Sequence, residues 1–386
     1  MARLSYVAVR MLIGDKLKYY GLVAGLAFSS FLIAQQASIF TGYASRTTAW
    51  LKDSAAADLW IFDPQVEFTE DTKSMSLSML NRVRGVDGVA WAVPMFKGYV
   101  KMRLPDGSLH QVRVIGIDDA SLIGGPPTMV EGALTDLRQD KALLVDEADL
   151  QSTLILKRAR EPRPLRTGDA VSMNDSEARV VGVFRRHKEF FWEPMVYTTF
   201  SRALQMAPQE RKMLTYVLAR VRPGENLQVV AKHIEAMTGM KAHTAEQFQE
   251  LTLWYTLQKT GILINFGITI GLGFIIGVLV SGQLLYNFVL DNTRYFGTLK
   301  AMGTPNRVIV RMVMLQAALA GAVGYGIGLG IAGVGGFFLG DGELAFRMTW
   351  HVPVFGLVSI VLCCIMAGTL SVYRVLRIEP AIVFKS

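Results

Sequence analysis

The chain has 386 residues, 51% of them hydrophobic, and a formal net charge of +8. It is more apolar than a soluble protein yet keeps a sizeable polar part, which indicates a membrane protein with one folded domain outside the membrane. Its two cysteines, Cys363 and Cys364, are adjacent in an apolar run, which excludes a disulfide framework and a zinc site. The cations cluster where apolar runs end, a positive-inside pattern that does not suggest nucleic acid binding.

The first 40 residues predict a surface helix followed by a membrane span. Residues 1–19 form an amphipathic helix, which we expect to lie against the anionic cytoplasmic leaflet of the lipid bilayer. Its apolar residues at helical spacing are Leu4, Val7, Ala8, Met11 and Leu12. Residues 20–40 carry no charge and, at ~1.5 Å per residue, are long enough to cross a ~30 Å hydrocarbon core. The N-terminus is therefore predicted to be cytoplasmic.

Residues 41–258 mix charges, strand-like runs and turn signals, so we predict one α+β extracytoplasmic (periplasmic) domain there. The predicted strands are 57–63, 89–104, 109–117, 142–146, 170–173, 179–183 and 214–222, and the predicted helices are 70–83 and 226–238. The second and third strands form a hairpin across Pro105-Asp106-Gly107.

The same domain contains residues that invite a chemical role. The segment RRHKEFFWEP, residues 185–194, is either a patch for a ligand or lipid headgroup or a solvated loop with a few anchoring aromatics, and the second interpretation is favoured. Asp146 and Glu147 are neighbours, and neighbours in a strand face opposite sides, so they cannot act as a catalytic dyad. The histidines lack metal-ligand spacing and no nucleophile motif is present. We therefore predict no catalytic residue, no metal site and no enzyme activity.

Three further spans follow. Residues 259–290 form the second, in which Gly267, Gly271, Gly273 and Gly277 make two small-xxx-small pairs for helix packing, and the uncharged helix suggests an interface between protomers. The third span covers residues 305–339 and is rich in glycine. A short external loop occupies residues 340–350. The fourth span covers residues 351–373, and residues 374–386 form a cytoplasmic tail. No span holds a central ionisable residue, which disfavours a secondary transporter.

Between the second and third spans lies a short cytoplasmic segment, residues 291–304, that begins DNTRYFGTLKAMG. Tyr295, Leu299 and Met302 share one helical face, with Phe296 beside it, so we predict an amphipathic helix. Gly303 provides its stop, and Pro305 suits the first turn of the next helix. The alternative is a solvated loop without function.

These residues resemble the coupling segment of FtsX/MacB-type ABC transporter permeases, the type VII ABC class, and within that family DevC-like exporter permeases. The tail RIEPAIVFKS is similar to the family's closing pattern. The resemblance implies a four-helix membrane protein whose segment contacts a separate ATP-binding subunit and passes its motion into the membrane. The implied ATPase-coupling residues are Arg294, Tyr295, Phe296, Gly297, Thr298, Leu299, Lys300, Ala301, Met302 and Gly303.

The chain has no GxxxxGK[ST] motif, so we expect ATP and magnesium on the partner subunit and no cofactor on this chain. Four spans are few for a transport path, which predicts a homodimer. An even number of spans places both termini in the cytoplasm, and the family resemblance implies the bacterial inner membrane. Two functions stay open. One is export of an amphiphile (a lipid, lipoprotein, haem-like compound or antibiotic) with a periplasmic adaptor, a membrane fusion protein. The other is an FtsX-like signal transmitter that activates a periplasmic hydrolase or reports a ligand.

Overall fold

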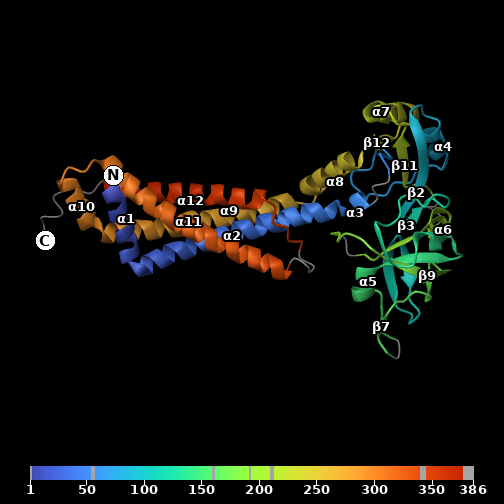
Figure 1. Cartoon of the computed structure of the whole chain (residues 1–386), viewed down its shortest axis with the longest axis horizontal. Helices are drawn as coiled ribbons and strands as arrows, with labels where there is room; N and C mark the ends of the chain where they lie inside the picture. The colour runs from blue at the N-terminus through green and yellow to red at the C-terminus, as the bar shows by residue number, and fades with distance from the viewer. Residues whose placement is uncertain are drawn as a thin grey trace. The chain divides into compact units, whose positions relative to one another are not determined.

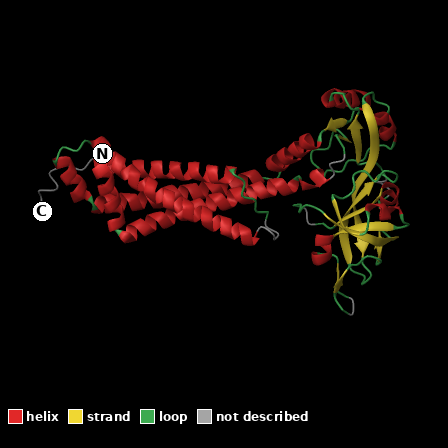
Figure 2. Ribbon diagram, in the orientation of Figure 1, coloured by secondary structure: helices red, strands yellow, loops and turns green. Residues whose placement is uncertain are grey.

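The computed structural model describes residues 2–53, 57–158, 161–190, 193–208, 213–339 and 345–376. The chain divides into two compact units. We call residues 1–44 with 261–386 the membrane unit, and residues 45–260 the sheet unit. The strands all belong to the sheet unit, whereas the membrane unit is helical (Figure 2).

The membrane unit contains six helices among its described residues. They are α1 (Ala2–Gly14), α2 (Lys16–Thr47), α9 (Ile262–Asp291), α10 (Thr293–Ala301), α11 (Asn306–Leu339) and α12 (His351–Leu376). Four of them, α2, α9, α11 and α12, are long and apolar enough to cross a membrane, and they run side by side in Figure 1. The first span is longer than the predicted 20–40, because Asp15 accepts a hydrogen bond from the Lys18 backbone amide and so starts α2 early.

Small residues bring these helices together. A Cβ atom added to Gly328 of α11 would lie 2.3 Å from the Ala27 carbonyl oxygen of α2, so the two backbones touch at this point. Ser29 of α2 donates a hydrogen bond to the Gly273 carbonyl of α9 at 2.8 Å. Gly321, Gly324 and Gly328 of α11 thus serve packing within the chain.

The sheet unit is built on ten strands in the order β12-β1-β11-β2-β3-β10-β5-β9-β4, with β8 pairing both β2 and β9. The strands are β1 (Leu59–Phe62), β2 (Val89–Arg103), β3 (Leu109–Ile117), β4 (Thr128–Glu131), β5 (Ala142–Asp146), β8 (Ala170–Met173), β9 (Ser176–Arg185), β10 (Met195–Thr199), β11 (Tyr216–Val221) and β12 (Lys241–His243); β6 (Ile155–Leu156) pairs with β7 (Arg163–Pro164) separately. The helical elements are α3 (Ala49–Asp53), α4 (Ser78–Arg84), η1 (Leu134–Arg138), α5 (Glu147–Ser152), α6 (Phe200–Met206), α7 (Leu227–Thr238) and α8 (Ala245–Lys259).

Side chains alternate along each strand, so the sheet has two faces, and helices pack against both of them. On one face, Phe96 and Val114 belong to a core that also holds residues of α4, α6 and α7. On the other face, Met95 and Ile115 belong to a second core with Trp50 of α3 and Phe248 of α8. The predicted α+β class is confirmed.

The secondary-structure predictions for the sheet unit were confirmed in part. The β2–β3 hairpin is confirmed, with Arg103 opposite Leu109 across the turn. The helix predicted at 70–83 begins only at Ser78, because Met75 instead forms a bridge with Leu214. The helix α8 was missed, although Thr244 and Gln247 form a capping box at its start. The predicted loop 340–350 and tail 374–386 fall partly outside the described residues.

Candidate functional site

The helix α10 has a buried side that anchors it. Phe296 is fully buried and packs in one cluster with Val289 of α9, with Ile309 and Val313 of α11, and with Val372 of α12. Phe296 was predicted to lie beside the outward face, but in the structure it lies inside the membrane unit. Its role is therefore to fix α10 to the ends of three membrane helices.

The C-terminal end of α10 is closed as predicted. Gly303 has a φ of +86°, its amide donates to the Lys300 carbonyl at 2.9 Å, and the Thr304 amide donates to the Leu299 carbonyl at 3.0 Å. This pair of hydrogen bonds is a Schellman motif, in which glycine supplies the left-handed residue. The motif stops α10 abruptly before α11 begins at Asn306.

The opposite side of α10 is open. Tyr295 is 65% exposed and Met302 is 69% exposed. Together with α1, this side forms a groove of about 920 Å³, which we call the α1–α10 groove. Figure 1 shows α1 and α10 at the same end of the membrane unit. The groove is lined by Tyr6, Val7, Arg10, Met11, Gly14, Asp15, Asp291, Asn292, Tyr295, Thr298, Leu299 and Met302.

The ten residues of the predicted coupling segment thus divide into three groups. Tyr295, Thr298, Leu299 and Met302 line the groove, and we call them the coupling face. Phe296 and Gly297 are buried. The others lie outside the groove lining; they are Arg294, Lys300, Ala301 and Gly303.

The helix α1 is packed against protein on one side. Ala8 is fully buried, and its carbonyl accepts a hydrogen bond from the Gln316 side chain of α11 at 2.9 Å. Lys18, just after α1, forms ion pairs with Asp15 and with Asp291 at the end of α9. The lipid-facing role predicted for residues 1–19 can therefore involve only other residues, such as the exposed Ile13 of α1 and Leu17 at the start of α2.

The four glycines predicted for helix packing fall into two pairs, one packed within the chain and one open. A Cβ on Gly273 would lie 3.3 Å from Leu32, and one on Gly277 would lie 2.4 Å from the Ser29 hydroxyl, so both face α2 within the chain. Gly267 and Gly271 have no such neighbour within 4 Å. Of the four, only this second pair leaves room for another protomer.

In the sheet unit, seven charged side chains form a buried group that we call the ionic cluster. Its members are Glu70, Lys97, Arg113, Asp146, Asp149, Arg186 and Glu189. The Lys97 ammonium donates to Glu70 at 2.6 Å and to the Thr69 carbonyl at 2.9 Å, and it lies 4.0 Å from the Trp50 ring centroid. Arg113 pairs with Glu189 and lies 3.7 Å from Glu70.

Arg186 holds the other end of the ionic cluster. It lies 3.1 Å from Asp146, 3.4 Å from Asp149 and 3.2 Å from Glu189. The side chains of Arg186 and Glu189 are only 9% and 3% exposed, so the prediction of a solvated loop for 185–194 is wrong at these two positions. Two aromatic positions of that segment, 191 and 192, lie outside the described residues.

The neighbouring carboxylates Asp146 and Glu147 do not form a dyad, as predicted, but the reason differs, because Asp146 ends strand β5 and Glu147 begins helix α5. Asp146 is buried in the ionic cluster, whereas Glu147 pairs at the surface with Arg185 at 2.6 Å. The missed signal for the cluster was the alternation of β2 and β3, which places Lys97 and Arg113 on one face among apolar residues.

The ionic cluster shifts two carboxyl groups in opposite directions. Burial alone would raise the pKa of Glu70, but the charges of Lys97 and Arg113 outweigh burial and lower it to about 2. Burial raises the pKa of Asp149 to about 6, because Arg186 offsets only part of the desolvation and Asp146 adds repulsion. At neutral pH the charged form of Asp149 therefore lowers the stability of the folded state. The charged form of Glu70 is instead stabilised by the cations beside it.

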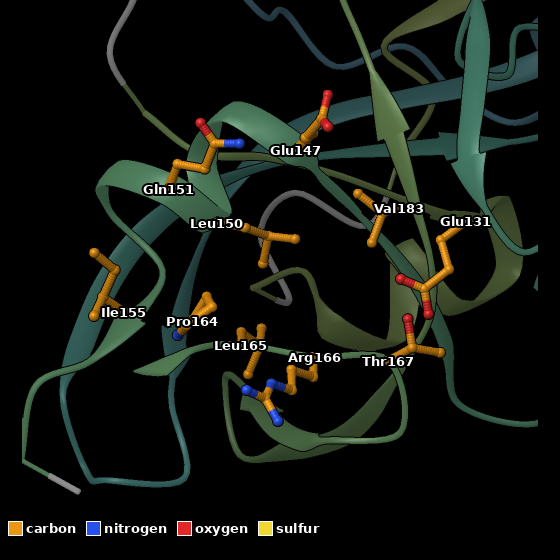
Figure 3. A pocket seen from close by; sticks show the side chains of 10 residues that line it. All are labelled: Glu131, Glu147, Leu150, Gln151, Ile155, Pro164, Leu165, Arg166, Thr167 and Val183. Carbon is orange, nitrogen blue, oxygen red and sulfur yellow. The ribbon is translucent and has the colours of Figure 1, made fainter. Parts of the chain in front are cut away.

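The sheet unit also has a surface pocket of about 720 Å³ beside α5, β7 and β9 (Figure 3). Figure 3 shows Leu150 and Leu165 near the middle of the lining, and the carboxylates of Glu131 and Glu147 further out. None of the lining residues is a cysteine or a histidine. Across the described part of the chain, no group of three or more metal-ligating side chains is present. The lining of this pocket therefore combines an apolar centre with two carboxylates further out.

Comparison with known proteins finds two family models that match the chain. The model of the MacB-like periplasmic core domain matches residues 22–237, more than half of the chain, and that of the FtsX-like permease C-terminal matches residues 254–380. The periplasmic region of MacB from Actinobacillus actinomycetemcomitans is 12% identical, with a TM-score of 0.37 over 51% of this chain and 92% of that chain. The extracellular domain of the noncanonic ABC-type transporter YknZ from Gram-positive bacteria is 15% identical, with a TM-score of 0.33 over 49% of this chain and 98% of that chain. No curated protein matches the chain.

Proposed function

Because this chain belongs to the FtsX/MacB-type permease family, an ABC-type permease family, we propose that it is the membrane subunit of an exporter whose α10 receives motion from a separate ATPase. ATP and magnesium are then bound by that partner subunit. The proposed cargo is an amphiphile such as a lipid, a lipoprotein, a haem-like compound or an antibiotic.

The two-sided geometry of α10 is the observation that carries this proposal. Its coupling face is open, while Phe296 on the other side is packed against three membrane helices. Protein interiors are close-packed and transmit strain, so a push on the open face moves the helix ends together. A solvated loop would need no such anchor.

The proposed topology follows from the cations around α10. Arg10, Arg294, Arg307 and Arg311 lie near the ends of α1, α10 and α11. By the positive-inside rule, we place this end and both termini in the cytoplasm and the sheet unit in the periplasm of a bacterial inner membrane. Two copies are proposed to associate through Gly267 and Gly271 of α9, because that glycine face is open.

A double substitution of the coupling face tests the proposal. Leu299→Asp with Met302→Asp places two charges where an apolar contact is expected, at a cost on the order of a few kcal/mol. We expect the ATPase to be lost on purification in detergent, or to hydrolyse ATP without stimulation by the permease. Ala301→Asp is the matched control, since Ala301 is exposed on the same helix and lies outside the groove lining.

Full ATPase retention and stimulation in the double variant would contradict the proposal. The partner found outside the membrane separates the two family roles. A co-purifying adaptor supports export, whereas a co-purifying hydrolase supports the FtsX-like signal transmitter.

A further inference from the structure

The α1–α10 groove has two walls, and the proposed function uses only one of them. The second wall is α1, with Tyr6, Val7, Arg10 and Met11 in the lining. We propose that α1 is the other half of the ATPase docking site and carries force from it into α2. This inference rests on the proposed function, which assigns the coupling face of α10 to the ATPase.

The charges of the groove favour a protein occupant over a lipid surface. Near the apolar lining stand two cations, Arg10 and Lys18, and two carboxylates, Asp15 and Asp291. An anionic leaflet attracts runs of cations, and a balanced set gives it no net attraction. A protein surface with an apolar side chain and a polar rim complements such a groove. The occupant is therefore the ATP-binding subunit, with an apolar side chain seated between α1 and α10.

The end of α1 and the start of α2 leave a separate surface for lipid. Ile13 of α1 and both Leu17 and Tyr20 of α2 are exposed and lie outside the groove lining. Tyr6 and Arg10, in contrast, lie one helical turn apart within the lining, with the guanidinium 5.4 Å from the ring centroid. That contact holds both side chains on the groove side.

The two walls are joined, so they must move together. Met11 of α1 packs against the cluster that holds Phe296 of α10, and beside it Lys18 at the start of α2 pairs with Asp291 at the end of α9. Ala8 and Leu12 are buried, and Gln316 of α11 binds the Ala8 carbonyl. Only Asp15 separates α1 from α2 in the chain. Force on the groove therefore follows two routes. It reaches α2 through α1, and it reaches α9 and α11 through α10.

The test compares three single variants of the full chain expressed with its ATPase. Leu299→Asp changes the α10 wall, Val7→Asp changes the α1 wall, and Ile13→Asp is the control on α1 outside the groove. We expect Val7→Asp, like Leu299→Asp, to lower ATPase retention in detergent at least tenfold, and Ile13→Asp to leave retention unchanged.

A cross-linking measurement covers the case in which a charged variant fails to fold. Val7→Cys, in a background with Cys363→Ala and Cys364→Ala, should cross-link to the ATPase with a short bis-maleimide, whereas Ile13→Cys should not.

The outcomes separate the inference from the proposed function. If Leu299→Asp loses the ATPase while Val7→Asp retains it and Val7→Cys gives no cross-link, the inference is overturned and the proposed function stands. If Ile13→Asp loses the ATPase and Val7→Asp does not, α1 acts as a lipid anchor and the inference is overturned. If none of the three variants loses the ATPase, both proposals fail.

Discussion

In the membrane unit, the long helices meet where side chains are smallest, whereas one face of the sheet unit contains seven buried charged side chains. Gly328 lets the backbone of α11 touch that of α2. Lys97 and Arg186 instead hold carboxylates from distant strands and loops. This difference predicts which kind of substitution destabilises each unit. Added volume should damage the membrane unit, and removal of a buried cation should damage the sheet unit.

The largest expected effect is the removal of Lys97. Lys97→Met leaves the carboxylate of Glu70 buried without its nearest cation, which typically costs about 3 to 5 kcal/mol of unfolding free energy. We expect denaturant unfolding of the full chain in detergent, followed by tryptophan fluorescence, to show this loss, since Trp50 lies against Lys97.

The matched control is Lys141→Met, which breaks the exposed pair with Glu177 and should cost at most about 1 kcal/mol. The double variant Lys97→Met with Glu70→Gln should recover part of the lost stability. Equal stability of the two lysine variants would show that the ionic cluster does not hold the sheet unit together.

A smaller effect is expected from one added methyl group in the membrane unit. Gly328→Ala brings a Cβ within 2.3 Å of a backbone oxygen that cannot swing away, so we expect a loss of up to about 3 kcal/mol. Gly330→Ala is the control, because a Cβ there meets no other atom within 4 Å. The measurement is the thermal midpoint of each purified variant, and equal midpoints would contradict the close α2–α11 contact.

The smallest of the three effects concerns Asp149 and depends on pH. The folded-state pKa is raised to about 6, so the folded chain binds this proton more tightly than the unfolded chain. The contribution to stability is full below the unfolded pKa and is lost as pH rises through about 6. Asp149 faces Asp146 and Arg186, with Arg113 further away, and accepts the Met195 amide at 2.9 Å.

Asp149→Asn should therefore remove this pH dependence and raise the stability at pH 7 by about 1 to 2 kcal/mol. Glu70 gives the opposite sign, because its lowered pKa makes its contribution present at neutral pH and lost on acidification toward pH 2. Unfolding curves between pH 4 and pH 7 measure the change. A pH profile identical to that of the unmodified chain would contradict the assignment to Asp149.

The sequence by itself determined what depends on neighbours along the chain. The four apolar helices, the β2–β3 hairpin and the Gly303 stop each depend on a run, a turn or a period of a few residues, and the structure contains all of them. The outward position of Tyr295, Leu299 and Met302 also follows from helical spacing. Spacing alone did not show that Phe296 on the same helix is an anchor, since its partners come from three other helices.

Only the tertiary structure decided which distant residues meet. Glu70, Lys97, Arg113 and Arg186 are far apart in the chain. The β2–β3 register places Lys97 and Arg113 on one face of the sheet, and Glu70 and Arg186 reach them from segments outside the strands. In the same way, Gly273 faces α2 while Gly271 is open, although both belong to one glycine pattern. A side chain's own type sets the chemistry it can perform, but its burial and its partners depend on elements that fold against it from elsewhere.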